Sequence, residues 1–183
     1  MTITNTPLPG LVQLRPRIHH DERGQFVVTY DQRRFNELVG GPLYFVQDNE
    51  STSKAGVLRG LHYQLPPSAQ GKLVHVVKGS VLDVCVDIRP DAPTYGQHYK
   101  VVLDDVHKDM LWIPPGFAHG FVALEEGTVF VYKCTALYDP STERCIRWND
   151  PVLNIDWGIA APLVSAKDEV GAAFGSQEPW PSR

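Results

Sequence analysis

The sequence predicts an all-β fold, a barrel or jelly roll in which residues 1–183 form a single domain. Three observations lead to this prediction. Short runs rich in β-branched and aromatic residues recur along the chain. The 15 Gly and 15 Pro interrupt these runs at the short spacing typical of sandwiches and barrels. Strands and helices do not alternate, so a parallel sheet is not expected. A chain of 183 residues is long enough to bury a sizeable core.

The elements follow from these patterns in chain order. Residues 31–38 predict a short helix, because Asp31 suits the N-cap and Gly40-Gly41 ends the segment. Strands are expected at 43–49, 57–64, 72–78, 81–89, 99–103, 110–113, 120–124 and 129–138. Residues 165–174 predict a second helix, since Ser165 stands three residues before Asp168, the spacing of a capping box. Both helices are expected at the periphery of the barrel.

Composition excludes several classes of function. The 17 Lys+Arg against 21 Asp+Glu give a formal net charge of −4, without the broad basic surface of a nucleic-acid-binding protein. No apolar run approaches the roughly 18–20 residues that span a bilayer, and the first ten residues do not resemble a signal peptide. The three cysteines form no CxxC pair. A disulfide framework or zinc knuckle is therefore not expected. The protein is expected in the cytoplasm, where cysteines stay reduced.

Two predicted strands place polar and aromatic side chains on one face. A period of two along 129–138 groups Phe130 with Tyr132 and Tyr138, and along 43–49 it groups Gln47 with Asn49. These faces fit a ligand pocket inside a barrel, and equally a solvated strand end.

Two of the seven histidines stand out by their neighbours. His62 lies within a predicted strand beside Arg59 and Gly60, and His119 follows a Pro-Gly turn. The Pro-x-Gly-x-x-His spacing resembles the second motif of the cupin superfamily of jelly-roll barrels. Metal-binding cupins also carry a His-x-His and Glu cluster in their first motif, which is absent after His62. With no Asp, Glu or Cys next to either histidine in the sequence, no metal site is expected.

A more specific resemblance covers the chain from about Leu11 to Phe174. Eight segments resemble, in order, the dTDP-4-dehydrorhamnose 3,5-epimerase family. They are 23–26, 45–49, 56–64, 70–74, 112–121, 132–133, 148–151 and 163–168. The resemblance implies a cupin-like jelly roll that works as a homodimer, without metal or cofactor. It also implies the third step of dTDP-L-rhamnose synthesis, the conversion of dTDP-4-dehydro-6-deoxy-D-glucose to dTDP-4-dehydro-L-rhamnose.

Such an epimerisation removes a proton beside a ketone and returns one to the opposite face, so it needs a base, an acid and a cation for the enolate oxygen. The resemblance assigns these roles to His62 as base, Tyr132 as acid and Lys72 as cation, with Asp168 orienting His62. Each also has a structural interpretation. Tyr132 suits a core aromatic, Lys72 a solvated strand start, and Asp168 the capping box. Only their occurrence together favours catalysis.

Further positions match substrate-binding residues of the family. They are Arg23, Phe26, Gln47, Asn49, Arg59, Lys72, His119, Tyr138, Glu143 and Lys167. Guanidinium groups suit phosphate oxygens, and the resemblance implies that Tyr138 stacks on thymine. It also implies that the N-terminal part, with Arg23 and Phe26, reaches the pocket of the neighbouring subunit.

One departure bears on the reaction. Val28 stands where the family commonly has Glu, so a polar contact to the substrate is missing or supplied elsewhere. Two alternatives therefore remain open. One is a mono-epimerase acting on C3 or C5 in another deoxysugar pathway, and the other is a sugar-nucleotide-binding cupin without catalysis. Retention of His62, Lys72, Tyr132 and Asp168 argues against the second, because binding alone needs no acid–base pair.

Overall fold

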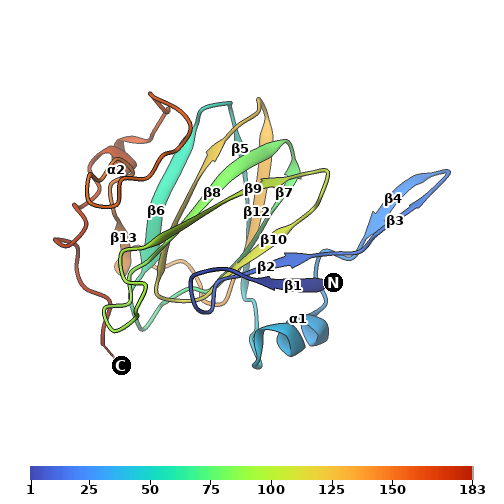
Figure 1. Cartoon of the computed structure of the whole chain (residues 1–183), viewed down its shortest axis with the longest axis horizontal. Coiled ribbons are helices and arrows are strands. Elements are labelled where there is room, and N and C mark those ends of the chain that lie inside the picture. The colour runs from blue at the N-terminus through green and yellow to red at the C-terminus, as the bar shows by residue number, and fades with distance from the viewer. Residues whose placement is uncertain (183) are drawn as a thin grey trace.

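Two antiparallel sheets dominate the computed structural model, which describes residues 1–182 (Figure 1). The six-stranded sheet has the order β1-β2-β10-β7-β12-β5. Its strands are β1 (Thr2–Asn5), β2 (Val12–Arg15), β10 (Met110–Ile113), β7 (Lys72–Lys78), β12 (Thr128–Cys134) and β5 (Gln47–Ser53). The five-stranded sheet has the order β13-β6-β11-β8-β9. Its strands are β13 (Glu143–Cys145), β6 (Leu58–Gln64), β11 (Phe117–Ala123), β8 (Ser80–Asp87) and β9 (His98–Asp104).

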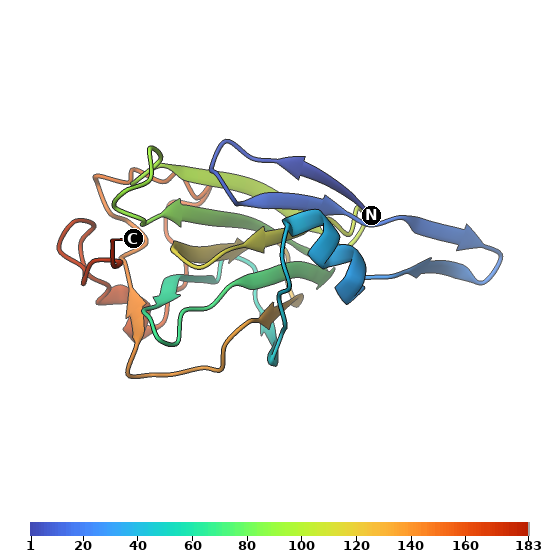
Figure 2. The ribbon, with the colours of Figure 1, turned by 90° about the horizontal axis from the view of Figure 1, so that it is seen from below.

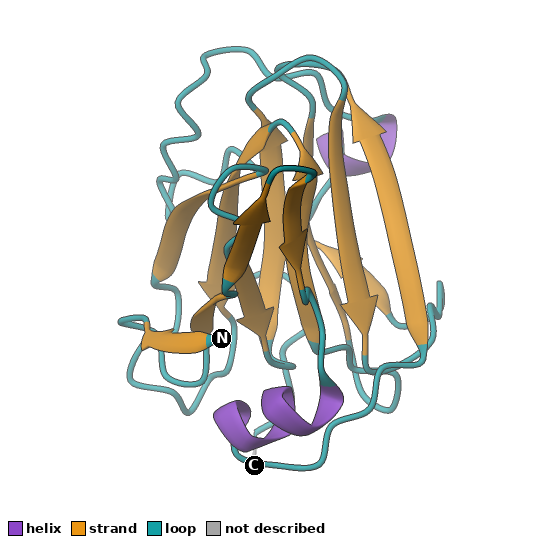
Figure 3. Cartoon of the chain, turned by 90° about the vertical axis from the view of Figure 1, so that its right-hand side faces the viewer, coloured by secondary structure: helices purple, strands orange, loops and turns teal. Residues whose placement is uncertain are grey.

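The sheets pack face to face over a shared core. The buried cluster between them takes Val74, Val76 and Phe130 from the six-stranded sheet and Cys85 and Phe121 from the five-stranded one. Figure 3 shows the strands as the body of the molecule, with the two helices at its periphery. The predicted all-β jelly roll with short peripheral helices is confirmed.

Helix α1 (Gln32–Val39) covers the outer face of the six-stranded sheet, where its buried Phe35 packs against Trp112. The Asp31 side chain accepts a hydrogen bond from the Arg34 N–H at 2.8 Å, as expected of an N-cap. Gly40 ends the helix at φ 84°, a left-handed conformation that suits glycine. The helix expected at 31–38 is therefore confirmed.

The hairpin of β3 (Ile18–Asp21) and β4 (Gly24–Val27) forms a separate two-stranded sheet. Figures 1 and 2 show this ribbon extending away from the two sheets. Phe26 on β4 is 66% exposed, and Val28 just after the hairpin is 48% exposed. Such exposed apolar side chains on a projecting arm are typical of an interaction surface.

Several predicted boundaries were wrong, by three residues at the start of β11 (Phe117–Ala123, expected at 120–124) and by more in three other elements. The strand expected at 43–49 is β5, Gln47–Ser53, whose polar sequence carries no apolar alternation and which forms by pairing with β12. The strand expected at 129–138 ends at Cys134. The helix expected at 165–174 is only α2, Ala166–Glu169, because the chain then turns and Ala172 pairs with Ile146.

Within residues 1–182, no helix is both long and apolar enough to cross a membrane.

Candidate active site

A cavity of about 480 Å³ opens between the two sheets, and side chains from both sheets line it. Eight of the residues predicted from the sequence meet there: Arg59, His62, Lys72, His119, Tyr132, Glu143, Lys167 and Asp168. They come from β6, β7, β11, β12, β13 and α2, so only the folded barrel brings them together.

The two predicted site histidines are cross-strand neighbours. His119 on β11 lies opposite His62 on β6 in the antiparallel register. The strands approach closely at this point because Gly60 has no side chain. A Cβ on Gly60 would lie 2.5 Å from the Gly120 Cα, and the residue has a φ of 132°. Glycine at position 60 thus allows the strand packing that sets both imidazoles at the cavity wall.

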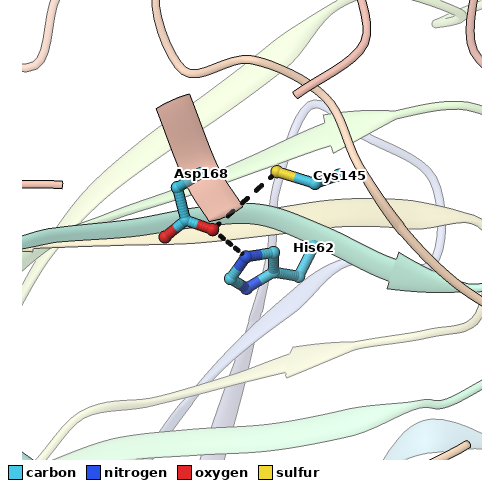
Figure 4. A group of neighbouring side chains, drawn as sticks. All are labelled: His62, Cys145 and Asp168. Atoms are coloured by element: carbon cyan, nitrogen blue, oxygen red, sulfur yellow. Dashed lines mark hydrogen bonds and ion pairs between the residues drawn. The ribbon is translucent and has the colours of Figure 1, made fainter. Parts of the chain in front are cut away.

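His62 and Asp168 form a hydrogen-bonded pair, with Nε2 2.5 Å from Oδ1. Burial of Asp168 opposes its ionisation, but hydrogen bonds from His62 and from the Gly60 N–H outweigh burial and lower the pKa of the carboxyl group. An ionised Asp168 accepts a hydrogen bond from the His62 Nε2–H, which leaves the Nδ1 lone pair free in the neutral ring. Figure 4 shows Nδ1 on the side of the ring away from Asp168.

The capping interpretation of Asp168 is half correct. Ser165 caps α2, since its Oγ accepts from the Asp168 N–H at 3.2 Å. The Asp168 carboxylate, however, does not complete a capping box, because it turns to His62 and Gly60. Backbone hydrogen bonds hold α2 in place at both ends. Before the helix, the Leu58 N–H donates to the Leu163 carbonyl oxygen, and after it the Ala172 N–H donates to the Cys145 carbonyl oxygen.

Lys72 and Tyr132 face the histidines from the opposite sheet. The Lys72 Nζ lies 6.0 Å from the centre of the Tyr132 ring. Burial lowers the pKa of Lys72 and raises that of Tyr132. The phenol therefore stays protonated near neutral pH and is available as a proton donor.

Sequence reasoning missed Asp83, which lies on β8 behind His119. Its Oδ2 is 2.9 Å from the His119 Nε2, and the Asp83 side chain is completely buried. This contact orients the His119 ring, which also stacks on Phe130 with ring centroids 6.1 Å apart. A carboxylate inside the apolar run of residues 81–86 was the signal that could have identified it.

Cys145 on β13 was also missed. It lies opposite His62 in the β13–β6 register, and its Sγ is 3.9 Å from the Asp168 Oδ1. Burial and the charge of Asp168 raise the pKa of this thiol to about 12, so it is protonated at neutral pH.

The candidate nucleotide-binding residues gather beside the main cavity. Gln47, Asn49 and Tyr138 line a smaller space of about 220 Å³, to which His62, Lys72, Tyr132 and Glu143 also contribute. Tyr138 is 52% exposed, and its hydroxyl donates to Glu143 at 2.8 Å. Glu143 also forms an ion pair with Lys167. An exposed ring held by a carboxylate at the mouth of a cavity is suited to stacking on a base.

Arg23 and Phe26 lie apart from this cavity. Both are on the β3–β4 hairpin, where Arg23 pairs with Asp21 at 2.5 Å and its side chain is 90% exposed. The small hollow that they line is made by residues 21–26 of the hairpin itself. Within one chain, the structure does not bring these two residues to the site.

Two groups within residues 1–182 have the donor atoms to hold a metal ion. They are His62 with Cys145 and Asp168, and His119 with Asp83 and Cys85. The prediction that no acidic or sulfur ligand lies near either histidine was therefore wrong for the folded chain. It considered only neighbours in sequence, whereas these ligands come from other strands and from α2.

Comparison with known proteins gives a consistent result. The family model described as dTDP-4-dehydrorhamnose 3,5-epimerase matches residues 5–175. The enzyme of that name from Pseudomonas aeruginosa is 50% identical over 182 residues, which cover 99% of this chain and 100% of the relative.

Solved structures agree. A dTDP-6-deoxy-D-glucose-3,5-epimerase from Legionella pneumophila, in complex with dTDP-4-keto-L-rhamnose, superposes with a TM-score of 0.94 at 43% identity, covering 100% of this chain and 99% of that one. A 3'-monoepimerase from Streptomyces bikiniensis, in complex with dTDP-quinovose, superposes with a TM-score of 0.89 at 31% identity, covering 93% and 87%. From the family match and the identity over nearly its full length, this chain belongs to the dTDP-4-dehydrorhamnose 3,5-epimerase family.

Proposed function

We propose that this chain converts dTDP-4-dehydro-6-deoxy-D-glucose to dTDP-4-dehydro-L-rhamnose by epimerisation at C3 and C5, the third step of dTDP-L-rhamnose biosynthesis. The observation that carries the proposal is the His62–Asp168 pair on one side of the cavity, with Lys72 and Tyr132 on the other. Family membership supports it independently.

In the proposed mechanism His62 is the base. Its Nε2–H is engaged by Asp168, so Nδ1 takes the proton from the carbon beside the C4 ketone. The ring then becomes an imidazolium, and the buried Asp168 carboxylate stabilises this positive charge through the 2.5 Å contact. Removal of the proton leaves an enolate with negative charge on the C4 oxygen.

Lys72 is proposed to stabilise that oxygen, because its ammonium group is fixed inside the cavity and needs little reorganisation when the charge develops. Tyr132 is proposed to return a proton to the opposite face of the carbon. Its origin on the sheet facing His62 supports this role, since inversion requires the acid and the base on different sides of the sugar ring. The chemistry moves protons only, so it requires no redox cofactor.

The dTDP portion is proposed to lie toward the smaller space beside the cavity. Tyr138 would stack on thymine, Gln47 and Asn49 would contact the base or phosphates, and Arg59 would bind phosphate oxygens. Glu143 and Lys167 would complete the nucleotide contacts, and His119 would line the sugar end.

We further propose that the working form is a homodimer in which the β3–β4 hairpin of each chain reaches the cavity of its partner. The exposed Phe26 and Arg23 on a hairpin that projects from the body support this arrangement. It would supply the two predicted site residues that one chain leaves outside its own cavity. The three free cysteines are consistent with action in the reducing cytoplasm.

The test is incubation with dTDP-4-dehydro-6-deoxy-D-glucose in deuterated water, followed by NMR of the product. Deuterium at both C3 and C5, with inversion at both, supports the proposal. Deuterium and inversion at only one carbon would instead favour a mono-epimerase, the activity given for the Streptomyces bikiniensis relative. Val28, exposed next to the hairpin, makes this comparison necessary. Binding without any exchange would identify a non-catalytic sugar-nucleotide-binding protein.

A further inference from the structure

The His62–Asp168 pair has a third neighbour that the proposed mechanism does not use, the thiol of Cys145. Figure 4 shows one oxygen of the Asp168 carboxylate in contact with both the His62 ring and the Cys145 sulfur. The Asp168 Oδ1 is 2.5 Å from the His62 Nε2 and 3.9 Å from the Cys145 Sγ, and the three donor atoms all lie within 4.8 Å of one another.

The fold holds these three side chains together. Cys145 and His62 are directly opposite in the antiparallel β13–β6 pair, so both project from the same face of the sheet. Asp168 is carried by α2, and its segment is tied to both strands by the hydrogen bonds from Leu58 to Leu163 and from Ala172 to Cys145. The donor set is thus preorganised by regular elements, as metal sites require.

We propose that His62, Cys145 and Asp168 bind a zinc ion, and that the bound ion switches the active site off. Imidazole nitrogen, thiolate sulfur and carboxylate oxygen are the three ligand types that zinc takes in proteins. One thiolate and one carboxylate neutralise the two positive charges of the ion. Three protein ligands leave a fourth position for water, and the cavity beside His62 and Asp168 has room for it.

The adjustment needed is small. Ligand distances of about 2.0–2.3 Å around a tetrahedral zinc ion place neighbouring donor atoms roughly 3.3–3.6 Å apart. The His62–Asp168 contact must open from 2.5 Å, and the Cys145–Asp168 contact must shorten from 3.9 Å. The His62 and Cys145 donor atoms already lie within 4.8 Å of each other. The first two changes are below about 1 Å and the third is at most about 1.5 Å, distances that side-chain rotation provides.

Zinc binding rearranges the protons of the pair. The Cys145 thiol loses its proton to solvent, and the metal takes the lone pair of the His62 Nε2. The single N–H proton of the neutral ring therefore moves from Nε2 to Nδ1, so Nδ1 has no lone pair left to accept a proton from the substrate. Inhibition by this route rests on the proposed function, in which Nδ1 is the base, whereas the binding of zinc does not.

The first test measures binding alone, on full-length protein freed of metal with EDTA. Isothermal titration with Zn²⁺ should show one site per chain, and Co²⁺ should give a thiolate-to-cobalt charge-transfer band. In Cys145→Ala the band should vanish and the zinc affinity should fall by roughly 10–100-fold or more. Cys145→Ser, which keeps the size of the side chain, should behave in the same way. Mg²⁺ should not bind, because it requires several oxygen ligands.

Cys85→Ala is the matched control, since Cys85 also lies beside an Asp–His pair but is completely buried. This variant should keep the cobalt band and the zinc affinity of the parent. The zinc site is overturned if Cys145→Ala and Cys145→Ser bind zinc as tightly as the parent, or if the band is lost in Cys85→Ala instead.

The second test measures epimerase activity with and without Zn²⁺, as a ratio for each variant. Zinc should inhibit the parent and Cys85→Ala, excess EDTA should restore their activity, and Cys145→Ala should need about tenfold more zinc or above for the same inhibition. Zinc bound at Cys145 without inhibition would refute the switch. Metal-free parent protein that lacks activity would refute the proposed function, while the binding test would still decide the zinc site.

Discussion

Replacing Asp168 with Asn separates a catalytic carboxylate from a structural one. Asparagine has nearly the same shape, so the position is still filled and the Ser165 cap, which uses the backbone N–H of residue 168, is retained. What is lost is the negative charge 2.5 Å from the His62 Nε2. The substitution therefore acts on the imidazolium that forms when the substrate proton is removed.

The expected size of the effect follows from the contact. A hydrogen bond to a charged group contributes about 1.5–3 kcal/mol and a neutral one about 0.5–1.5 kcal/mol, so the lower limit of the loss is about 1 kcal/mol. Two unit charges about 4 Å apart in a partly solvated site interact by about 4 kcal/mol, which sets the upper limit. In kcat these limits correspond to a decrease of roughly 5- to 1000-fold.

The assay is steady-state turnover of dTDP-4-dehydro-6-deoxy-D-glucose, together with thermal unfolding of both proteins. We expect the lower kcat with a melting temperature within a few degrees of the parent, because about 1 kcal/mol shifts the midpoint of a protein of this size by only about 2–4 °C. The structural interpretation gives the reverse pattern. If Asp168→Asn melts early but turns over at the parental rate, the carboxylate does not support His62 and the reasoning fails.

Four other predictions test the remaining parts of the site and the fold. His62→Ala should abolish both turnover and exchange of substrate protons with deuterated water, and normal exchange in this variant would refute the mechanism. Tyr132→Phe should form epimerised product about 10²–10⁴-fold more slowly but keep some exchange without inversion. Tyr138→Ala should weaken dTDP binding by about 1–3 kcal/mol in a calorimetric titration, and equal affinities would exclude Tyr138 as the thymine platform. Exhaustive chelation should not lower activity, so activity lost with EDTA and regained with added metal would contradict the proton-transfer mechanism. Stability should decrease in acid because of Asp150, whose burial opposes ionisation but whose hydrogen bonds outweigh burial and lower its pKa in the folded state. The stabilisation by Asp150 is present above its unfolded pKa of about 3.9 and is lost as the pH falls through its folded pKa. Urea unfolding at pH 6 and pH 3 would measure the loss, with Asp150→Asn as the less pH-dependent control.

Strands whose pattern is local were predictable from the sequence. The runs that became β7 and β10 were placed at their observed bounds, since apolar residues in them are buried between or against the sheets and turn residues flank them. The helix α1 was predictable for the same reason, because Asp31 and Gly40 satisfy its ends without help from the rest of the fold.

Strands that depend on a partner were not predictable. Polar β5 exists because β12 offers seven paired residues, and short β13 exists because it pairs with β6. Tertiary pairing also shortened α2. In its expected second half, the backbone of Ala172 forms hydrogen bonds with Cys145 and Arg147 instead of continuing the helix. In each case hydrogen bonds to a distant strand outweigh the local preference of the segment.

The short apolar runs interrupted by Gly and Pro by themselves determined the fold class, and the chain order of motifs determined the family and the residue types of the site. The motifs alone single out His62, Lys72, Tyr132 and Asp168, and the cavity contains all four. The resemblance already suggested that Asp168 orients His62, and the tertiary structure decided between this pairing and a cap on its own helix end. Only the tertiary structure placed Asp83 behind His119 and Cys145 beside the base. These contacts join residues up to 106 positions apart. Their geometry depends on strand register and on the packing of two sheets, which the spacing of residues along one chain does not encode.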